Sequence, residues 1–163
     1  MSAEESQCDA VDEKYPTIKK SPFVWIPPHL EADGVRPKFP PRKPELRKPL
    51  LWVAVTNNQA WLVNCCDQAL PRVVVQKGGV GGGDEPATYN ANEDWIYRDI
   101  PPGFCALVDE WDGFYDLDFY LYCYLDIEVP GYGDMSFCAD GTRKGYIDEQ
   151  VLLWDNGDKG GRR

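Results

Sequence analysis

Side chains that commonly carry out catalysis near neutral pH are scarce in this sequence. His29 is the only histidine, and it lies beside Pro27 and Pro28 in a proline-rich stretch. Because histidine is the usual proton acceptor near pH 7, a serine or cysteine mechanism would require this stretch to deliver His29 to a nucleophile. Ser136 is the only serine beyond residue 50, and no G-x-S-x-G motif surrounds it. We therefore expect a protein that is not an enzyme.

Carboxylates are the remaining groups with catalytic potential. They gather at Asp109, Glu110, Asp112, Asp116 and Asp118. Two carboxyl groups at a set separation suffice for glycoside hydrolysis, and neighbouring loop carboxylates also suit Ca²⁺, although the EF-hand spacing is absent. We interpret the group mainly as a solvated acidic surface and expect no cofactor. Asp109, Asp112 and Asp116 are the candidate calcium ligands, and carboxylate-based hydrolysis is the other alternative.

The strongest positive signal is the alternation of residue types between Asp116 and Val129. Side chains of a β-strand point alternately to its two faces. One set is apolar: Leu117, Phe119, Leu121, Cys123, Leu125, Ile127 and Val129. The other set is polar or tyrosine: Asp116, Asp118, Tyr120, Tyr122, Tyr124, Asp126 and Glu128. Helical spacing would mix the two sets, so the pattern predicts one long strand with its apolar side in a core.

The tyrosines of this strand are the predicted binding residues. Tyr120, Tyr122 and Tyr124 would point the same way about 7 Å apart, twice the rise per residue. Tyrosine is enriched in protein interfaces because it offers a large contact area and a hydroxyl group at the rim. The flanking Asp118 and Asp126 belong to the same predicted surface.

Two alternatives to an open tyrosine surface remain. The proline-rich arm could cover it through Phe23, Trp25 and Phe39, with arm Lys and Arg paired to the strand's carboxylates. A different aromatic group, Trp111, Phe114 and Tyr115, could instead stack on a carbohydrate or lipid headgroup beside the acidic loop, with or without Ca²⁺.

Strand signals recur every ten to fifteen residues, with Gly, Pro and Asn between them. We predict strands at residues 50–55, 60–66, 72–76, 104–108, 116–129, 135–139 and 146–154, turns at 56–59 and 140–141, and a flexible glycine loop at 78–83. Without a helix of useful length, the pattern predicts an all-β antiparallel sandwich. The order of turns and strands resembles immunoglobulin-like and fibronectin-type sandwiches, a resemblance that implies a fold and no activity.

Four segments follow from composition. Residues 1–14 are acidic and aperiodic, which predicts a disordered tail. Residues 15–49 contain nine prolines, so they form a basic, extended arm, whose apolar tetrad at residues 23–26 should pack on the domain. Its residues 36–44 resemble a polyproline ligand, and a packed or solvated linker is the alternative. The sandwich occupies residues 50–156, and residues 157–163 are a predicted disordered C-terminal tail.

Charge is divided along the chain, whose net charge is −10. Residues 14–49 hold nine basic and three acidic side chains, a balance of +6, whereas residues 50–163 hold eight and nineteen, a balance of −11. An acidic domain repels nucleic acid and favours a basic partner. No apolar run reaches the roughly 20 residues of a membrane helix.

The N-terminus does not resemble a secretion signal, so a cytoplasmic location is expected. In that compartment the six cysteines should be free thiols, with a disulfide such as Cys105 to Cys123 as the alternative.

The leading functional hypothesis is a non-enzymatic, acidic, cytoplasmic module that binds or inhibits a basic protein, in the manner of immunity proteins. The alternatives are a sandwich that binds carbohydrate or lipid headgroups, possibly with Ca²⁺, and a structural component of a larger assembly. The partner and the oligomeric state are not predicted.

Overall fold

β-Strands account for nearly all regular structure in the part of the chain that the computed structural model describes, which is residues 17–30, 43–81, 88–90, 95–112 and 118–161. The strands are β1 Ile18–Lys20, β2 Pro49–Thr56, β3 Gln59–Asn64, β4 Leu70–Gly81, β5 Thr88–Asn90, β6 Trp95–Ile100, β7 Phe104–Glu110, β8 Phe119–Val129, β9 Gly133–Asp140 and β10 Gln150–Trp154. One short 3-10 helix, η1 Pro28–Leu30, is added in these ranges.

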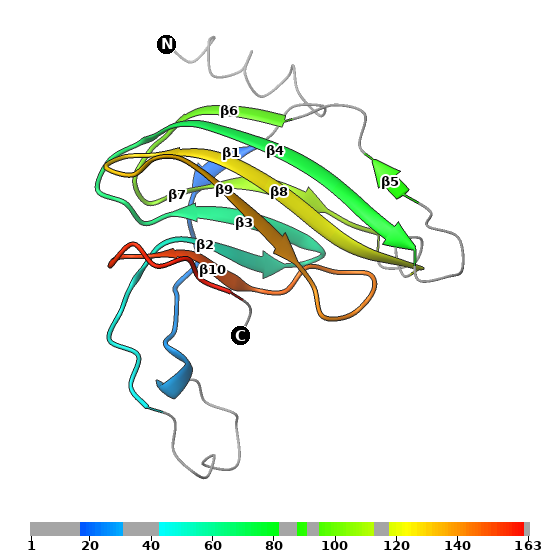
Figure 1. The fold of residues 1–163 in the computed structure, drawn as a ribbon, viewed down its shortest axis with the longest axis horizontal. Helices are drawn as coiled ribbons and strands as arrows, with labels where there is room; N and C mark the ends of the chain where they lie inside the picture. The colour runs from blue at the N-terminus through cyan, green and yellow to red at the C-terminus, as the bar shows by residue number, and fades with distance from the viewer. Residues whose placement is uncertain (1–16, 31–42, 82–87, 91–94, 113–117, 162–163) are drawn as a thin grey trace.

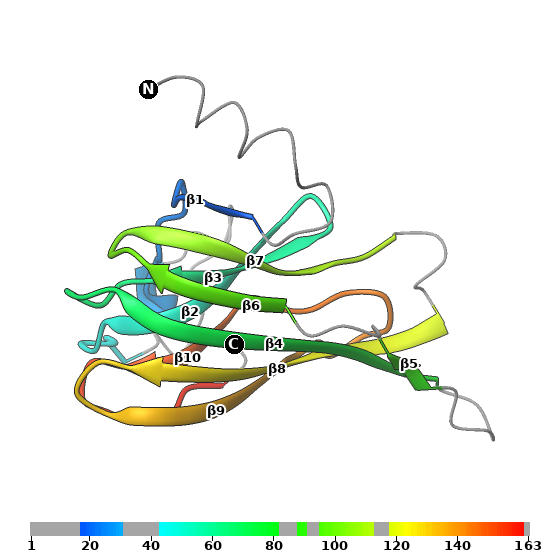
Figure 2. The ribbon, with the colours of Figure 1, turned by 90° about the horizontal axis from the view of Figure 1, so that it is seen from above.

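The strands form two antiparallel sheets that pack face to face (Figure 1). Sheet A has the order β1-β7-β3-β2-β10, and sheet B has the order β5-β4-β8-β9, with β6 also paired to β4. Figure 2 shows sheet B from its outer side, with β6, β4, β8 and β9 next to one another. The predicted antiparallel β-sandwich is therefore confirmed, and its immunoglobulin-like character stays a prediction.

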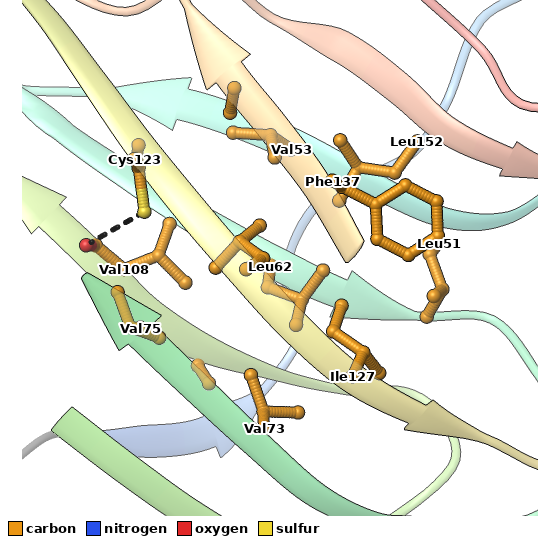
Figure 3. Packing of buried hydrophobic residues seen from close by; sticks show 14 of the residues in the cluster. Leu51, Val53, Leu62, Val73, Val75, Val108, Cys123, Ile127, Phe137 and Leu152 are labelled. Atoms are coloured by element: carbon orange, nitrogen blue, oxygen red, sulfur yellow. Dashed lines mark hydrogen bonds between the residues drawn. The ribbon is translucent and has the colours of Figure 1, made fainter. Parts of the chain in front are cut away.

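The core lies between the sheets and comes from alternate residues of their strands (Figure 3). In β8 the residues Leu121, Cys123, Leu125, Ile127 and Val129 are all buried, which confirms the predicted apolar side of this strand. Opposite them, sheet A contributes Leu51, Val53 and Leu62, which belong to the same buried cluster as Phe137 and Ile127 of sheet B (Figure 3). The free energy gained by removing this apolar surface from water holds the two sheets together.

The β2–β3 hairpin forms where the sequence predicts a turn. Asn57 and Asn58 both have positive φ angles, 48° and 61°. A two-residue turn of this kind fits the right-handed twist of the strands, and asparagine tolerates it better than other residues that carry a Cβ. The register Thr56 to Gln59 follows directly from this turn.

Sheet A, unlike sheet B, is apolar on both of its faces. Its outer face carries a second buried cluster that is distinct from the core: Trp52, Ala54, Trp61, Val63, Cys105, Leu107 and Val151. Residues 17–30 and 43–48 are called the strap below. Its β1 is the edge strand of sheet A, and its Phe23 and Trp25 pack on this outer face. Phe23 meets the Trp52 ring edge-on at 6.5 Å between centroids, and Trp25 meets Trp154 edge-on at 5.5 Å. The prediction that residues 23–26 pack on the domain is confirmed for Phe23 and Trp25 and is wrong for Val24 and Ile26, which are exposed.

Polar contacts fix the strap at several points. β1 pairs with β7, and the Ser21 N–H donates to the Gly103 carbonyl at 2.9 Å. The Lys19 ammonium lies 4.1 Å from the centre of the Trp61 ring, and the Arg47 guanidinium lies 4.3 Å from that of Trp154. Each of these cation–π contacts adds about 0.5–1 kcal/mol at such partly exposed sites.

Three predicted elements differ in extent from those observed. Gly78–Gly81 belong to β4 and pair with β8, so the predicted flexible loop is wrong there, and its residues 82 and 83 lie outside the described ranges. The missing Cβ of Gly78 provides the room for Tyr122, because a Cβ would come within 2.4 Å of that ring. The long strand begins at Phe119 instead of Asp116, although residues 116 and 117 lie outside the described part.

The last strand also begins later than predicted. β9 ends at Asp140 and β10 begins at Gln150, so a longer connection replaces the predicted hairpin turn at residues 140–141. Gln150 is buried and its amide group donates to the carbonyls of Asp140 and Asp148, which closes this connection from within.

The C-terminal segment is bound to sheet A as far as Gly160, where the sequence predicts a disordered tail. The Trp154 N–H donates to the Asp158 carbonyl at 2.8 Å, and the Gly160 N–H donates to the Leu152 carbonyl at 2.9 Å. These bonds satisfy the edge of β10, which would otherwise expose unpaired backbone groups.

Gly160→Ala is expected to detach this segment. A Cβ on Gly160 would come within 2.0 Å of the Val151 carbonyl oxygen, whereas a Cβ on Gly161 meets nothing within 4 Å. Backbone cannot move aside as a side-chain tip can, so the Gly160 N–H should lose its protection from hydrogen exchange in this variant. Gly161→Ala is the matched control and should exchange like the unmodified protein. Equal protection in both variants would contradict the predicted contact.

Candidate binding surface

The outer side of sheet B carries the three predicted tyrosines along β8 and is called the tyrosine face. The side chains of Tyr120 and Tyr124 are 45% and 50% exposed, while Tyr122 is half-buried because its ring lies over Gly78. Tyr122 and Tyr124 contact each other with ring centroids 5.0 Å apart and planes inclined at 60°. The Lys144 ammonium lies 5.6 Å from the centre of the Tyr120 ring.

Neighbouring strands extend this surface with apolar side chains. Val80 of β4 lies opposite Tyr120 in the register and is 41% exposed. Ile96 of β6 lies opposite Val74 and is 48% exposed. Strands β6, β4 and β8 are adjacent in Figure 2, so these side chains occupy one continuous sheet face. An exposed group of large apolar and aromatic side chains is typical of interaction sites.

Charged groups lie around the tyrosines. Four exposed carboxylates come from β8, β9 and the residue before β8: Asp118, Asp126, Glu128 and Asp134. Two exposed arginines, Arg72 and Arg98, lie in the same cross-strand row as Glu128 and Asp134. Asp126 accepts a hydrogen bond from the Ser136 hydroxyl at 2.6 Å, beside a hollow of about 210 Å³. The carboxylates are thus concentrated on the β8–β9 half of the face.

The predicted binding residues therefore divide into two groups. Tyr120, Tyr122, Tyr124 and Asp126 are together on the tyrosine face, and Asp118 is exposed immediately before β8. Trp111 is only 6% exposed and packs in the core, so it offers no surface on which a sugar could stack. Phe114 and Tyr115, the other members of the predicted aromatic platform, lie outside the described residues.

Of the three candidate calcium ligands, the structure describes Asp109 and Asp112. Asp109 is 4% exposed, and its carboxylate accepts the Glu110 N–H at 2.8 Å. Asp112 is exposed, and Asp116 lies outside the described residues. Within the described ranges no group of three His, Cys, Asp or Glu side chains could hold a metal ion.

The strap lies on sheet A and leaves the tyrosine face open. Phe23 and Trp25 pack on the outer cluster of sheet A, so the alternative in which they cover the tyrosines is wrong; Phe39 lies outside the described residues. The physical reason is that Trp52 and Trp61 give sheet A a more apolar outer face than the β8 tyrosines and carboxylates give sheet B. Arg47 pairs with Glu45 at 2.5 Å and Asp158 at 3.4 Å instead of with the carboxylates of β8.

Catalytic groups do not converge in the described part of the chain. His29 uses its Nδ1 atom to accept the Glu45 N–H at 3.0 Å, which gives this histidine a structural role within the strap. Ser136, which lies in β9, donates a hydrogen bond to Asp126 and not to His29. This arrangement lacks the contact between base and nucleophile that nucleophilic catalysis requires.

The described cysteines, Cys65, Cys66, Cys105, Cys123 and Cys138, are free thiols. Cys105 packs on the outer face of sheet A, whereas Cys123 points into the core and donates to the Val108 carbonyl at 3.6 Å, so the alternative disulfide between them does not form. Burial raises the pKa of the Cys66 thiol to about 11 and also raises the pKa of Cys105 and Cys123. A raised pKa keeps these thiols neutral and weakly nucleophilic.

The raised pKa values of buried groups also predict that stability falls at alkaline pH. The ordinary pKa of a cysteine thiol is 9.0, and burial raises the pKa of Cys66 to about 11 in the folded protein. Burial raises the pKa of Tyr97 as well. The folded state therefore holds protons that the unfolded state releases above pH 9, so this stabilisation is complete below pH 9 and is lost as the pH rises through 11. We expect a loss of about 2 kcal/mol between pH 8 and pH 11.

Urea unfolding at a series of pH values measures this loss. Cys66→Ala should make the decline shallower. A free energy of unfolding that stays constant from pH 8 to pH 11 would contradict the expected linkage.

Sequence reasoning missed the apolar and glycine residues of the tyrosine face. Val80 and Gly78 lie in the stretch predicted as a loop, and Ile96 lies in a segment for which no strand was predicted. The sequence did contain a strand signal for the segment with Ile96, because Trp95, Tyr97 and Ile100 are apolar or aromatic and Arg98 is charged.

Comparison of the chain with protein-family models, curated proteins and solved structures finds no match. In the described residues there is no helix of the length and apolar character that crossing a membrane requires. The geometry of the surface is therefore the basis for assigning a role.

Proposed function

We propose that this protein is a non-enzymatic interaction module that binds a basic protein through its tyrosine face. The observation that carries the proposal is that Tyr120 and Tyr124 are about half exposed on a sheet face that the strap does not cover. The same face carries exposed carboxylates, and residues 50–163 have a charge balance of −11. An inhibitor of the kind formed by immunity proteins is the specific form of this proposal.

The energetics suit such a role. Covering the exposed parts of three tyrosines together with Val80 and Ile96 would contribute several kcal/mol at about 25 cal/mol per Å² of apolar surface. Because these side chains are held by a sheet, little additional ordering opposes binding. The acidic rim accelerates encounter with a basic partner and makes the association rate fall as salt concentration rises.

The double substitution Tyr120→Ala with Tyr124→Ala is expected to weaken binding at least tenfold while the domain stays folded. Both side chains point away from the core, and a tenfold loss corresponds to about 1.4 kcal/mol. Capture of proteins from the source cell, identified by mass spectrometry, gives the partner, and calorimetry with that purified partner gives the affinity. The captured protein should be basic and should bind more weakly at high salt.

Tyr132→Ala is the matched control. Tyr132 is 45% exposed, like Tyr120, but it lies at the turn between β8 and β9, away from the row of tyrosines. It should retain the affinity of the unmodified protein. If both variants capture the same proteins with the same affinity as the unmodified chain, the tyrosine face is not the binding surface.

A further inference from the structure

The strap has an apolar outer side of its own. Its residues alternate, so that Phe23 and Trp25 face sheet A while Val24 and Ile26 face outward and are 80% and 49% exposed. Two leucines of the strap are also exposed: Leu30 is 65% exposed and Leu46 is 88% exposed. We call these four side chains the strap surface. Exposed aliphatic side chains are unfavourable in water, and burying them against a partner would be favourable.

The strap as a whole is also basic. In residues 17–30 and 43–48 there are five Lys and Arg side chains and one carboxylate, a balance of +4: Lys19, Lys20, Lys43, Arg47, Lys48 and Glu45. Glu45 and Asp158 both pair with Arg47, and Lys19 lies over the Trp61 ring, so the three remaining lysines supply the outward positive charge. Lys20, Lys43 and Lys48 are all exposed.

The strap surface and the tyrosine face lie on opposite sides of the sandwich. The strap covers sheet A, and the tyrosines cover the outer side of sheet B, as the two layers in Figure 1 show. One surface is basic and aliphatic, while the other is aromatic and rich in carboxylates. We propose that the strap surface of one copy of this chain docks on the tyrosine face of a second copy, an inference that rests on the proposed role of the tyrosine face.

Charge complementarity supports this occupant. The tyrosine face presents Asp118, Asp126, Glu128 and Asp134 with Asp140 at its margin, against three cations, Arg72, Arg98 and Lys144. Arg72 and Arg98 lie in the cross-strand row of Glu128 and Asp134, which leaves Asp118 and Asp126 to meet Lys20, Lys43 and Lys48 of the next copy. The net charge of −10 repels copies at long range, so the contact should be weak and dependent on concentration.

The arrangement determines the kind of assembly. A contact between two different surfaces is heterologous, so each added copy leaves one strap surface and one tyrosine face free. Such contacts build short open chains or a ring, whereas a two-fold dimer would pair like surfaces. A contact of ordinary size would cover about 800 Å² on each copy.

Complementation between two variants tests the proposal. The strap variant, Val24→Asp with Leu46→Asp, alters only highly exposed side chains, and the face variant is Tyr120→Ala with Tyr124→Ala. In sedimentation equilibrium the unmodified protein should show a mass that rises with concentration, and each variant alone should remain at 18.5 kDa. An equimolar mixture should form a complex of twice that mass and nothing larger, because each variant supplies the surface that the other lacks.

The outcomes separate this inference from the proposed function. An unmodified chain that stays at the monomer mass up to about 1 mM, or self-association without a complex in the mixture, overturns the head-to-tail contact. Either result leaves the proposed function standing if the face variant still loses its captured basic protein. Urea unfolding of each variant shows that a loss of association does not arise from a loss of folding, and Tyr132→Ala should associate like the unmodified protein.

Discussion

Replacing Phe23 and Trp25 together by alanine is expected to lower the free energy of unfolding by about 4 kcal/mol. Truncation of a fully buried Phe or Trp costs about 3–5 kcal/mol, and these two rings are half-buried, so each should cost roughly half as much. Their loss removes the edge-on contacts with Trp52 and Trp154 and leaves the outer cluster of sheet A open to water.

Urea unfolding followed by tryptophan fluorescence measures this effect. Val24→Ala is the control from the same segment, because Val24 is 80% exposed, and it should change stability by less than about 0.5 kcal/mol. A similar loss in both variants, or no loss in either, would show that the strap does not pack on sheet A as described.

The expected loss reflects how the sequence builds sheet A. β2 reads Leu-Leu-Trp-Val-Ala-Val and β3 contains Ala-Trp-Leu-Val, so both strands are apolar at successive positions. A strand that is apolar at every position must be covered on both faces. Sheet B covers one face, and Phe23 and Trp25 of the strap pack on the other together with Trp95 and Trp154.

This difference between strands could have located the strap in advance. β8 alternates strictly between apolar and polar or tyrosine residues, which predicts a strand with one open face, whereas β2 and β3 do not alternate. The open tyrosine face and the covered tryptophan face are therefore both encoded locally. Weighing Trp52 and Trp61 against Tyr120 and Tyr124 as docking surfaces for the arm would have favoured sheet A.

Other parts of the fold were not predictable from local patterns. Gly78 and Gly79 resemble a loop in sequence, and they are in β4 because Tyr122, more than forty residues later, needs the space above Gly78. The register of β3 and β7 shifts between Ala60 and Trp61, next to the pair formed by Ala60 and the buried Asp109. Such contacts depend on tertiary packing, which overrides strand and turn propensities.

Leu125→Ala is expected to cost about 3–4 kcal/mol of stability, and the neighbouring Tyr124→Ala about 1 kcal/mol or less. Leu125 has no exposed surface and lies in the core between Val75 and Phe137 in the register, so its truncation loses both transfer free energy and packing. Tyr124 is 50% exposed and loses mainly its contact with the Tyr122 ring.

Urea unfolding of the two single variants compares the two faces of one strand under identical conditions. A large loss for Leu125→Ala together with a small loss for Tyr124→Ala means that the tyrosine contributes little to folding, which leaves its exposed ring available for a partner. If Tyr124→Ala were as destabilising as Leu125→Ala, the ring would be part of the packed structure, and its exposure could no longer be taken as a sign of binding. The comparison therefore bears on the proposed function even before a partner has been identified.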